Sequence, residues 1–169
     1  MVGAPTSVGQ CKSGVELGPN ALRAAGLIKQ LQHLGHNVVD FGDIPHQSIN
    51  TNQNSVNNKL KNVSEVQEMC SQLYSLVEKV VLDKRIPITL GGDHSIAMAS
   101  ISGNAGVVPN DELCVVWVDA HADINTVATT RTGHFHGMPA SFLINQIQHH
   151  FNNPNNNCIQ DCETSSRVK

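Results

Sequence analysis

The sequence predicts an α/β protein with a parallel β-sheet. Residues 86–90 and 113–118 are short, mostly apolar runs of strand-forming residues, as expected for strands buried on both faces of such a sheet. Residues 64–81 carry apolar side chains three or four positions apart, which is typical of an amphipathic helix. Strands that alternate with helices form parallel sheets, and ligands bind beyond the carboxyl ends of their strands. We therefore expect functional residues directly after the two apolar runs.

The amino-terminal part is predicted to add two strands and a helix. Residues 1–4 are typical of the end of a strand, and Pro19 stands where the first turn of a helix tolerates proline. The helix after Pro19 has an apolar stripe, which we expect to be core, and Gly35 is placed to end it. The stripe consists of Leu22, Ala25, Leu27, Ile28, Leu31 and Leu34. Residues 37–41 predict another short strand.

The remaining segments predict one domain followed by a tail. Ser64 and Gln67 match a capping box at the start of the longest helix. Further helices are expected over residues 96–101 and from residue 140 onward, and the Asn- and Ser-rich residues 47–58 predict an exposed loop. We interpret residues 1–144 as the folded domain. The Asn-rich residues 145–169 predict a disordered tail.

Composition favours small-molecule chemistry. The chain has 169 residues, 40% of them hydrophobic, and a formal charge of −3 with no basic cluster, so neither nucleic acid nor an anionic membrane is an expected partner. No run approaches the roughly 18 apolar residues of a membrane span. Five cysteines without a paired framework suit a reducing compartment. Cytoplasm is the default expectation, and mitochondria become the alternative if a targeting segment has been lost.

A candidate metal cluster comes directly after residues 113–118. Asp119, His121 and Asp123 alternate with alanines, so extended geometry would project all three side chains from one side. Two carboxylates and an imidazole suit Mn²⁺ or another divalent ion better than a structural zinc. Taken singly, each residue is better explained by helix capping or an ordinary hydrogen bond. Together, after this apolar run, they favour metal binding.

A second group of polar residues comes after the strand predicted at residues 86–90. Gly91 and Gly92 allow a sharp backbone turn, and Ser95 is placed to cap the next helix. His94 lies within this turn, at the carboxyl end of a strand. Since the carboxyl ends of parallel strands share one edge of the sheet, we expect His94 and the cluster around Asp119 to lie on the same rim.

Three motifs carry a resemblance to a known family. In chain order they are Gly91-Gly92-Asp93-His94-Ser95, Asp119-Ala120-His121-Ala122-Asp123-Ile124-Asn125-Thr126 and His136-Gly137-Met138-Pro139. Together they resemble the arginases of the ureohydrolase family. The likeness extends from Val2 to about Leu143, and the Asn125-Thr126 continuation separates arginases from agmatinases. The resemblance implies a three-layer α/β fold with a parallel sheet.

The resemblance also implies the site. It makes His94, Asp119 and Asp123 ligands of one Mn²⁺, with Asp119 bridging to a second Mn²⁺ bound by His121. The implied substrate is L-arginine, hydrolysed to ornithine and urea, with His136 as the proton carrier. Substrate contacts fall on Asn125, Thr130, Thr132 and His134. At one of these positions, His134 stands where arginases generally have asparagine. The resemblance also implies a homotrimer, because the family forms trimers.

This chain departs from the family pattern beyond the third motif. Arginases supply further metal carboxylates from a later Asp-x-Asp strand end, and their sheet inserts two late strands between those ending at His94 and Asp119. The 169 residues contain no such segment. We therefore expect a truncated arginase with impaired activity. Two alternatives stay open: an inactive isoform that binds metal weakly or regulates full-length subunits, and another ureohydrolase such as an agmatinase.

Overall fold

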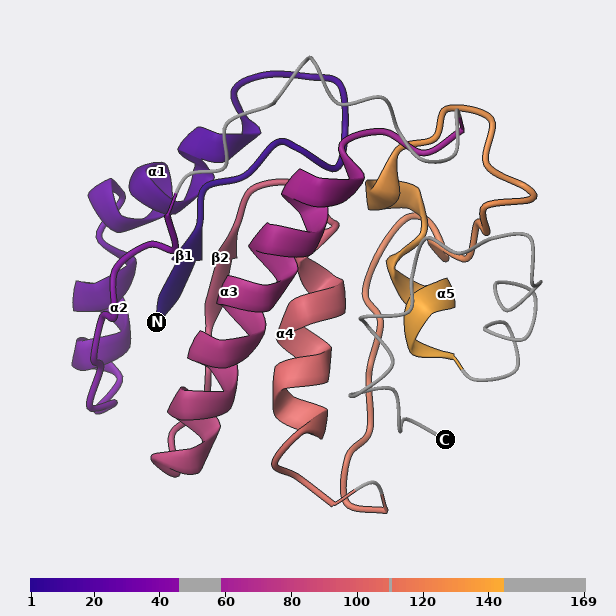
Figure 1. The fold of residues 1–169 in the computed structure, drawn as a ribbon. Helices are drawn as coiled ribbons and strands as arrows, with labels where there is room; N and C mark the ends of the chain where they lie inside the picture. The colour runs from indigo at the N-terminus through magenta and orange to yellow at the C-terminus, as the bar shows by residue number, and fades with distance from the viewer. Residues whose placement is uncertain (46–58, 110, 145–169) are drawn as a thin grey trace.

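A computed structural model describes residues 1–45, 59–109 and 111–144 (Figure 1). The predicted loop at residues 47–58 and the predicted tail at residues 145–169 lie outside the described residues. The division after residue 144 therefore stays a prediction. No helix in the described ranges has the length and apolar character needed to cross a membrane.

The sheet is parallel, as predicted. Strand β1 (Val2–Ala4) pairs with β2 (Thr89–Gly91), with Val2 beside Thr89 and Ala4 beside Gly91. The segment around Gly42 runs along the other edge of β1. There the N–H of Gly3 donates to the carbonyl of Gly42 and the N–H of Ile44 donates to the carbonyl of Gly3, both at 2.8 Å.

The strand predicted at residues 37–41 is not formed. Only one isolated bridge, between Gly3 and Asp43, has ladder geometry in this region. The predicted segment does meet β1, because the N–H of Phe41 donates to the Met1 carbonyl at 2.9 Å, but Gly42 has a left-handed φ of 78° and departs from strand geometry where the chain meets Gly3.

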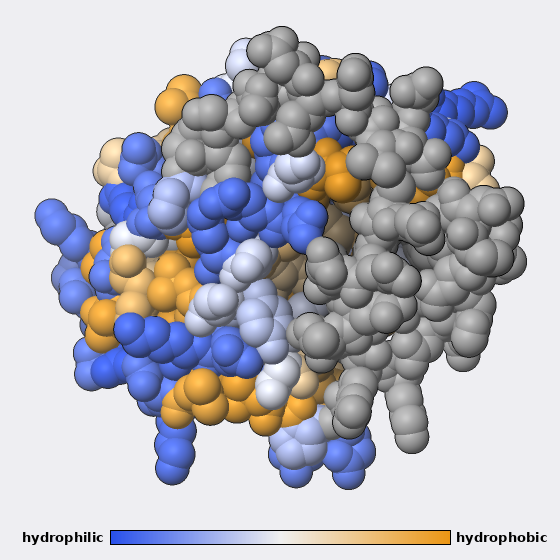
Figure 2. All heavy atoms as spheres, in the orientation of Figure 1, coloured by the Kyte–Doolittle hydropathy of each residue, from blue (hydrophilic) through white to orange (hydrophobic). Residues whose placement is uncertain are grey.

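The first predicted helix is divided in two. After a 3-10 turn, η1 (Val15–Leu17), helix α1 (Gly18–Ala24) ends before Gly26, whose φ of 86° is left-handed, and α2 (Leu27–His33) begins beyond it. The expectation that its apolar stripe is core is wrong, since none of the stripe residues is buried. Leu34 is 74% exposed. Figure 2 shows apolar side chains at the surface on the α1 and α2 side of the molecule.

The core lies around the two longest helices. Helix α3 (Val63–Leu82) buries one face, including Met69, Leu73 and Val77, and packs against both β1 and α4 (Ile96–Ala105). Gly103 lies at the α3–α4 contact, where a Cβ atom would come within 2.9 Å of the Tyr74 carbonyl oxygen and of Val77. In Figure 1 the two helices lie side by side.

The carboxyl-terminal part of the described chain packs against α4, on the side away from α3 (Figure 1). A 3-10 turn, η2 (Phe135–Gly137), leads into α5 (Pro139–Leu143), and α5 contacts α4. The rings of Phe135 and Phe142 stack with centroids 5.9 Å apart. This packing fixes η2, and with it His136, relative to the core.

The prediction of a buried strand at residues 113–118 is wrong. The segment forms no strand, and Val116 and Val118 are 81% and 93% exposed. The physical reason is the lack of a neighbour: among the described residues, none forms a backbone hydrogen bond with this segment. A strand-forming sequence needs paired edges and a covered face, and neither is provided here.

Candidate metal centre

The turn after β2 presents His94 at the edge of the sheet. Gly92 has a left-handed φ of 57°, and a Cβ atom there would lie 2.4 Å from the Ala4 carbonyl oxygen. Only glycine fits so close an approach of two backbones. Asp93, His94 and Ser95 follow and lead into α4. The turn at the two glycines therefore determines the position of the His94 backbone, from which its imidazole projects.

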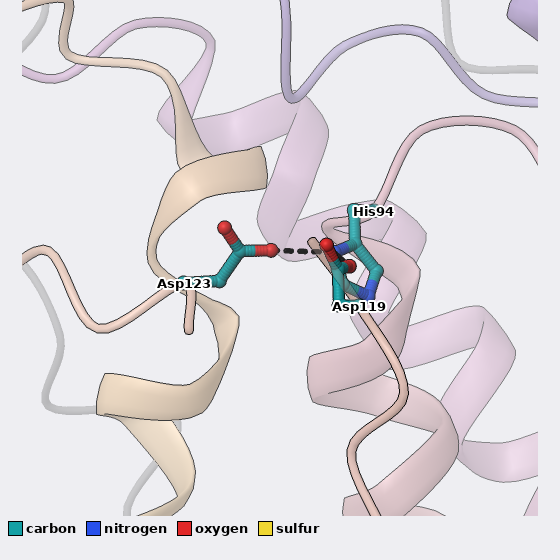
Figure 3. A group of neighbouring side chains, drawn as sticks. All are labelled: His94, Asp119 and Asp123. Carbon is teal, nitrogen blue, oxygen red and sulfur yellow. Dashed lines mark hydrogen bonds and ion pairs between the residues drawn. The ribbon is translucent and has the colours of Figure 1, made fainter. Parts of the chain in front are cut away.

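His94, Asp119 and Asp123 converge on one point (Figure 3). His94 Nδ1 lies 2.5 Å from Asp123 Oδ2 and 3.2 Å from Asp119 Oδ2. One ligand atom from each residue falls within 4.8 Å of the other two. The side chains are partly shielded, with exposed fractions of 35% for His94, 25% for Asp119 and 11% for Asp123.

Hydrogen bonding and nearby charge favour the ionised form of the Asp119 carboxylate. The backbone N–H of His121 donates to Asp119 Oδ1 at 2.9 Å and lowers the pKa of Asp119, an effect to which the nearby His94 also contributes. Two carboxylates beside one imidazole form a hard-to-borderline donor set. The convergent donor atoms therefore fit a divalent cation such as Mn²⁺.

His121 is not part of the convergent group. Its side chain is 80% exposed, and its Nδ1 lies 3.7 Å from Asp119 Oδ1. Among the described residues, no other His, Cys, Asp or Glu joins the cluster of three. The structure thus brings together three of the four predicted metal ligands and leaves the fourth at the surface.

The two histidines of the η2 region differ in environment. His136 is exposed, and its backbone N–H donates to the Gly9 carbonyl at 3.0 Å. His134 is only 8% exposed, with its Nε2 atom 3.5 Å from Lys61 Nζ. Burial, and then the positive charges of Lys61 and His136, lower the pKa of His134. The two rings meet edge-on at 6.0 Å.

The predicted substrate residues lie in the loop between the metal group and η2. Asn125 is tied to η2, because its N–H donates to the Gly137 carbonyl at 3.2 Å. Thr130 is buried and its hydroxyl accepts from the N–H of Gly133 at 3.1 Å, while the Thr132 hydroxyl accepts from the N–H of His134 at 3.3 Å. The backbone of Asn125 and the hydroxyls of Thr130 and Thr132 therefore help to shape the loop.

Two neighbours of His94 were not among the predicted site residues. The indole ring of Trp117 lies 5.0 Å from the imidazole of His94, between ring centroids. Asp93 is buried at 5% exposure, and its carboxylate accepts from the backbone N–H of Gly9. Its place beside His94 in the sequence could have marked Asp93 as a site residue. Its contact with Gly9 could not be predicted, because the two residues lie 84 positions apart in the chain.

The fold and the site define a parallel α/β protein with a candidate divalent-metal centre at the carboxyl edge of its sheet. Comparisons with known proteins refine that class. The Arginase family profile matches residues 1–160. "Arginase, non-hepatic 1" of Xenopus laevis is 49% identical over 148 residues, which cover 88% of this chain. "Arginase-2, mitochondrial" of Homo sapiens is 47% identical over the same length.

Solved structures agree with this match. The native arginase structure from Bacillus caldovelox superimposes with a TM-score of 0.77 at 40% identity over 84% of this chain. The chain belongs to the arginase family. It spans 40% of the Xenopus relative, 41% of the human relative and 47% of the Bacillus chain, which is less than half of each.

Proposed function

We propose that this chain provides the amino-terminal part of an arginase site, for hydrolysis of the guanidinium group of L-arginine to L-ornithine and urea. The observation that carries the proposal is the convergence of His94, Asp119 and Asp123 within an arginase-family fold. When bound, Mn²⁺ would lower the pKa of a coordinated water and so supply hydroxide near neutral pH.

The chain's own residues would hold and orient the reacting groups. Asp119 and Asp123 supply the negative charge that attracts the cation, and His94 supplies a neutral nitrogen donor. We assign His136 the transfer of a proton to the leaving amine, a role that an imidazole can fill because it both accepts and donates a proton. Asn125, Thr130, Thr132 and His134 are assigned to the α-carboxylate of the substrate or to its waters.

We expect turnover to be impaired in the 169-residue chain. Among the described residues, a second Mn²⁺ would have only Asp119 and His121 as protein ligands, and His121 lies outside the convergent group at 80% exposure. Divalent ions with so few protein ligands bind weakly. The proposed site is therefore one well-formed metal position with an incomplete neighbour.

A second candidate is a catalytically inactive protein that binds metal weakly or associates with full-length arginase subunits. The observation that favours it is the exposed apolar segment 113–118, which has no paired neighbour among the described residues. An agmatinase-type activity is a third candidate, and substrate choice distinguishes it.

Urea release tests the three candidates together. The full chain is incubated with Mn²⁺ and either L-arginine or agmatine, beside an Asp119→Ala variant and an Asp111→Ala control at an exposed position. The proposal predicts urea from L-arginine, none above background with Asp119→Ala, and wild-type release with Asp111→Ala. Release no greater than that of Asp119→Ala supports the inactive candidate. Release from agmatine alone supports the agmatinase.

A further inference from the structure

Asp93 is a buried carboxylate that accepts three hydrogen bonds and joins two separate parts of the chain, its own turn and the loop at Gly9. Its Oδ1 atom accepts from the backbone N–H of Ser95 at 2.9 Å and from the Ser95 hydroxyl at 2.5 Å. Its Oδ2 atom accepts from the backbone N–H of Gly9 at 2.8 Å. Only 5% of Asp93 is exposed. A buried carboxylate with three donors fixes its surroundings strongly, because loss of any donor is costly.

Gly9 passes this constraint on to the η2 turn. While its N–H donates to Asp93, its carbonyl accepts from the backbone N–H of His136 at 3.0 Å. The peptide units on either side of Gly9 thus join the turn that carries His94 to the turn that carries His136. A Cβ atom on Gly9 would lie 2.5 Å from Ser95 Oγ and 2.6 Å from Asp93 Oδ1, so the contact leaves no room for a side chain.

Two further hydrogen bonds hold residues 6–10 in this position. The backbone N–H of Asp93 donates to the Thr6 carbonyl at 2.9 Å. The Asn62 side chain, next to the start of α3, donates to the Val8 carbonyl at 2.8 Å. The loop is therefore anchored to the turn after β2 and to the α3 end, with His136 attached through the Gly9 carbonyl.

We propose that Asp93 is a positioning residue, which sets His94 and His136 in register with one another through Gly9. The inference rests on the proposed function, in which these histidines are a metal ligand and the proton carrier. Asp93 touches neither the cation nor the substrate in this role. It acts through the backbone on both sides of the site at once.

Amide hydrogen exchange of the full chain, measured residue by residue by NMR, tests the link without any need for catalysis. Asp93→Asn keeps the side-chain shape but places an amide where an anion accepted three hydrogen bonds. We expect exchange of the Gly9 and His136 amides to accelerate by about tenfold or more, and the amides of Leu73 and Val77 in α3 to keep their rates. Mn²⁺ affinity should fall by about tenfold, because support of a ligand is lost.

One control variant and one second test variant complete the experiment. Asp83→Asn removes an exposed carboxylate at the end of α3 and should change neither readout. Ser95→Ala removes only the hydroxyl donor and should produce a smaller acceleration at the same two amides. It decides the question if Asp93→Asn does not fold.

Unchanged exchange at Gly9 and His136 in these variants overturns the proposal. So does an equal acceleration at Leu73 and Val77, which would mean that Asp93 serves overall stability alone. A failure of the proposed function has a different signature, namely no urea release or no Mn²⁺ binding by the wild-type chain, and it leaves the exchange result standing.

Discussion

Asp123 combines a special backbone conformation with a directed side chain. Its φ of 49° lies in the left-handed region, which aspartate tolerates better than most residues. Its carbonyl accepts from the N–H of Ala140 at 3.1 Å, which ties it to α5, and its carboxylate faces His94. The position of this ligand is therefore set by the packing of η2 and α5 as well as by the chain on which it lies.

His134 should make folding stability depend on pH. In the unfolded chain an imidazole gains a proton below a pH of about 6.5. In the folded chain, burial lowers the pKa of His134, so the ring stays neutral to a lower pH. The unfolded state thus binds the proton first as the pH falls, and stability is lost through and below pH ~6.5, at no more than about 1.4 kcal/mol per pH unit.

Denaturant unfolding of His134→Asn between pH 5 and 7 checks this expectation. The variant should lose stability less steeply on acidification than the wild type. His33→Asn, at the exposed end of α2, is the matched control for removal of an imidazole and should keep the wild-type slope. Equal slopes for the wild type and His134→Asn would contradict the assignment.

At the scale of elements, α3 and α4 determine how the core packs. Their contact passes over Gly103, where an added methyl group would meet Tyr74 and Val77. Since both helices belong to a close-packed core, the overlap can be relieved only by moving one helix. Gly103→Ala should destabilise the fold by about 1–3 kcal/mol, despite the better helix propensity of alanine.

Thermal and denaturant unfolding measure this cost. Ser102→Ala, the neighbouring position on α4, serves as the control and should change stability by less than about 0.5 kcal/mol. A Gly103→Ala variant as stable as the wild type would mean that α3 and α4 are not in the close contact described.

The sequence predicts some elements well and others poorly, for physical reasons. Helix α3 matches its predicted bounds closely, because a long stripe of buried positions leaves a clear period. The break at Gly26 was missed, since a single glycine inside a helical pattern is compatible with either outcome. The strand at residues 113–118 was predicted from residue type alone, yet a strand also depends on neighbours that no local pattern specifies.

The same distinction applies to the candidate site. Placing His94, Asp119 and Asp123 on one rim needed only the rule that ligands gather at strand ends, and the structure brings the three together. The exposure of His121 and the burial of Asp93 beside Gly9 depend on tertiary contacts. Alternation along the chain could not separate Asp123, which faces His94, from His121, which does not.

At the scale of the whole molecule, strand-forming residues are exposed just before β2 and within residues 113–118. Ile86, just before β2, is 87% exposed, and Val116 is 81% exposed. In the described residues, β2 pairs only with β1, so its other edge is free. Exposed strand-forming segments and a free sheet edge both favour association between chains.

Charge on these segments should reduce association. We expect the double variant Ile86→Lys, Val116→Lys to scatter less light and to elute as smaller species than the wild type at equal concentration. Leu34→Lys changes a similarly exposed residue at the end of α2 and should have a smaller effect. Equal behaviour of the three proteins would mean that these segments do not drive association.

Metal stoichiometry is the decisive measurement for the assigned site. The full chain is titrated with Mn²⁺ and bound metal is counted by electron paramagnetic resonance. The proposed site predicts one tightly bound ion at His94, Asp119 and Asp123, which Asp123→Asn abolishes and His121→Asn retains. Two tightly bound ions per chain, or binding that survives Asp123→Asn unchanged, would contradict the assignment of the site to His94, Asp119 and Asp123.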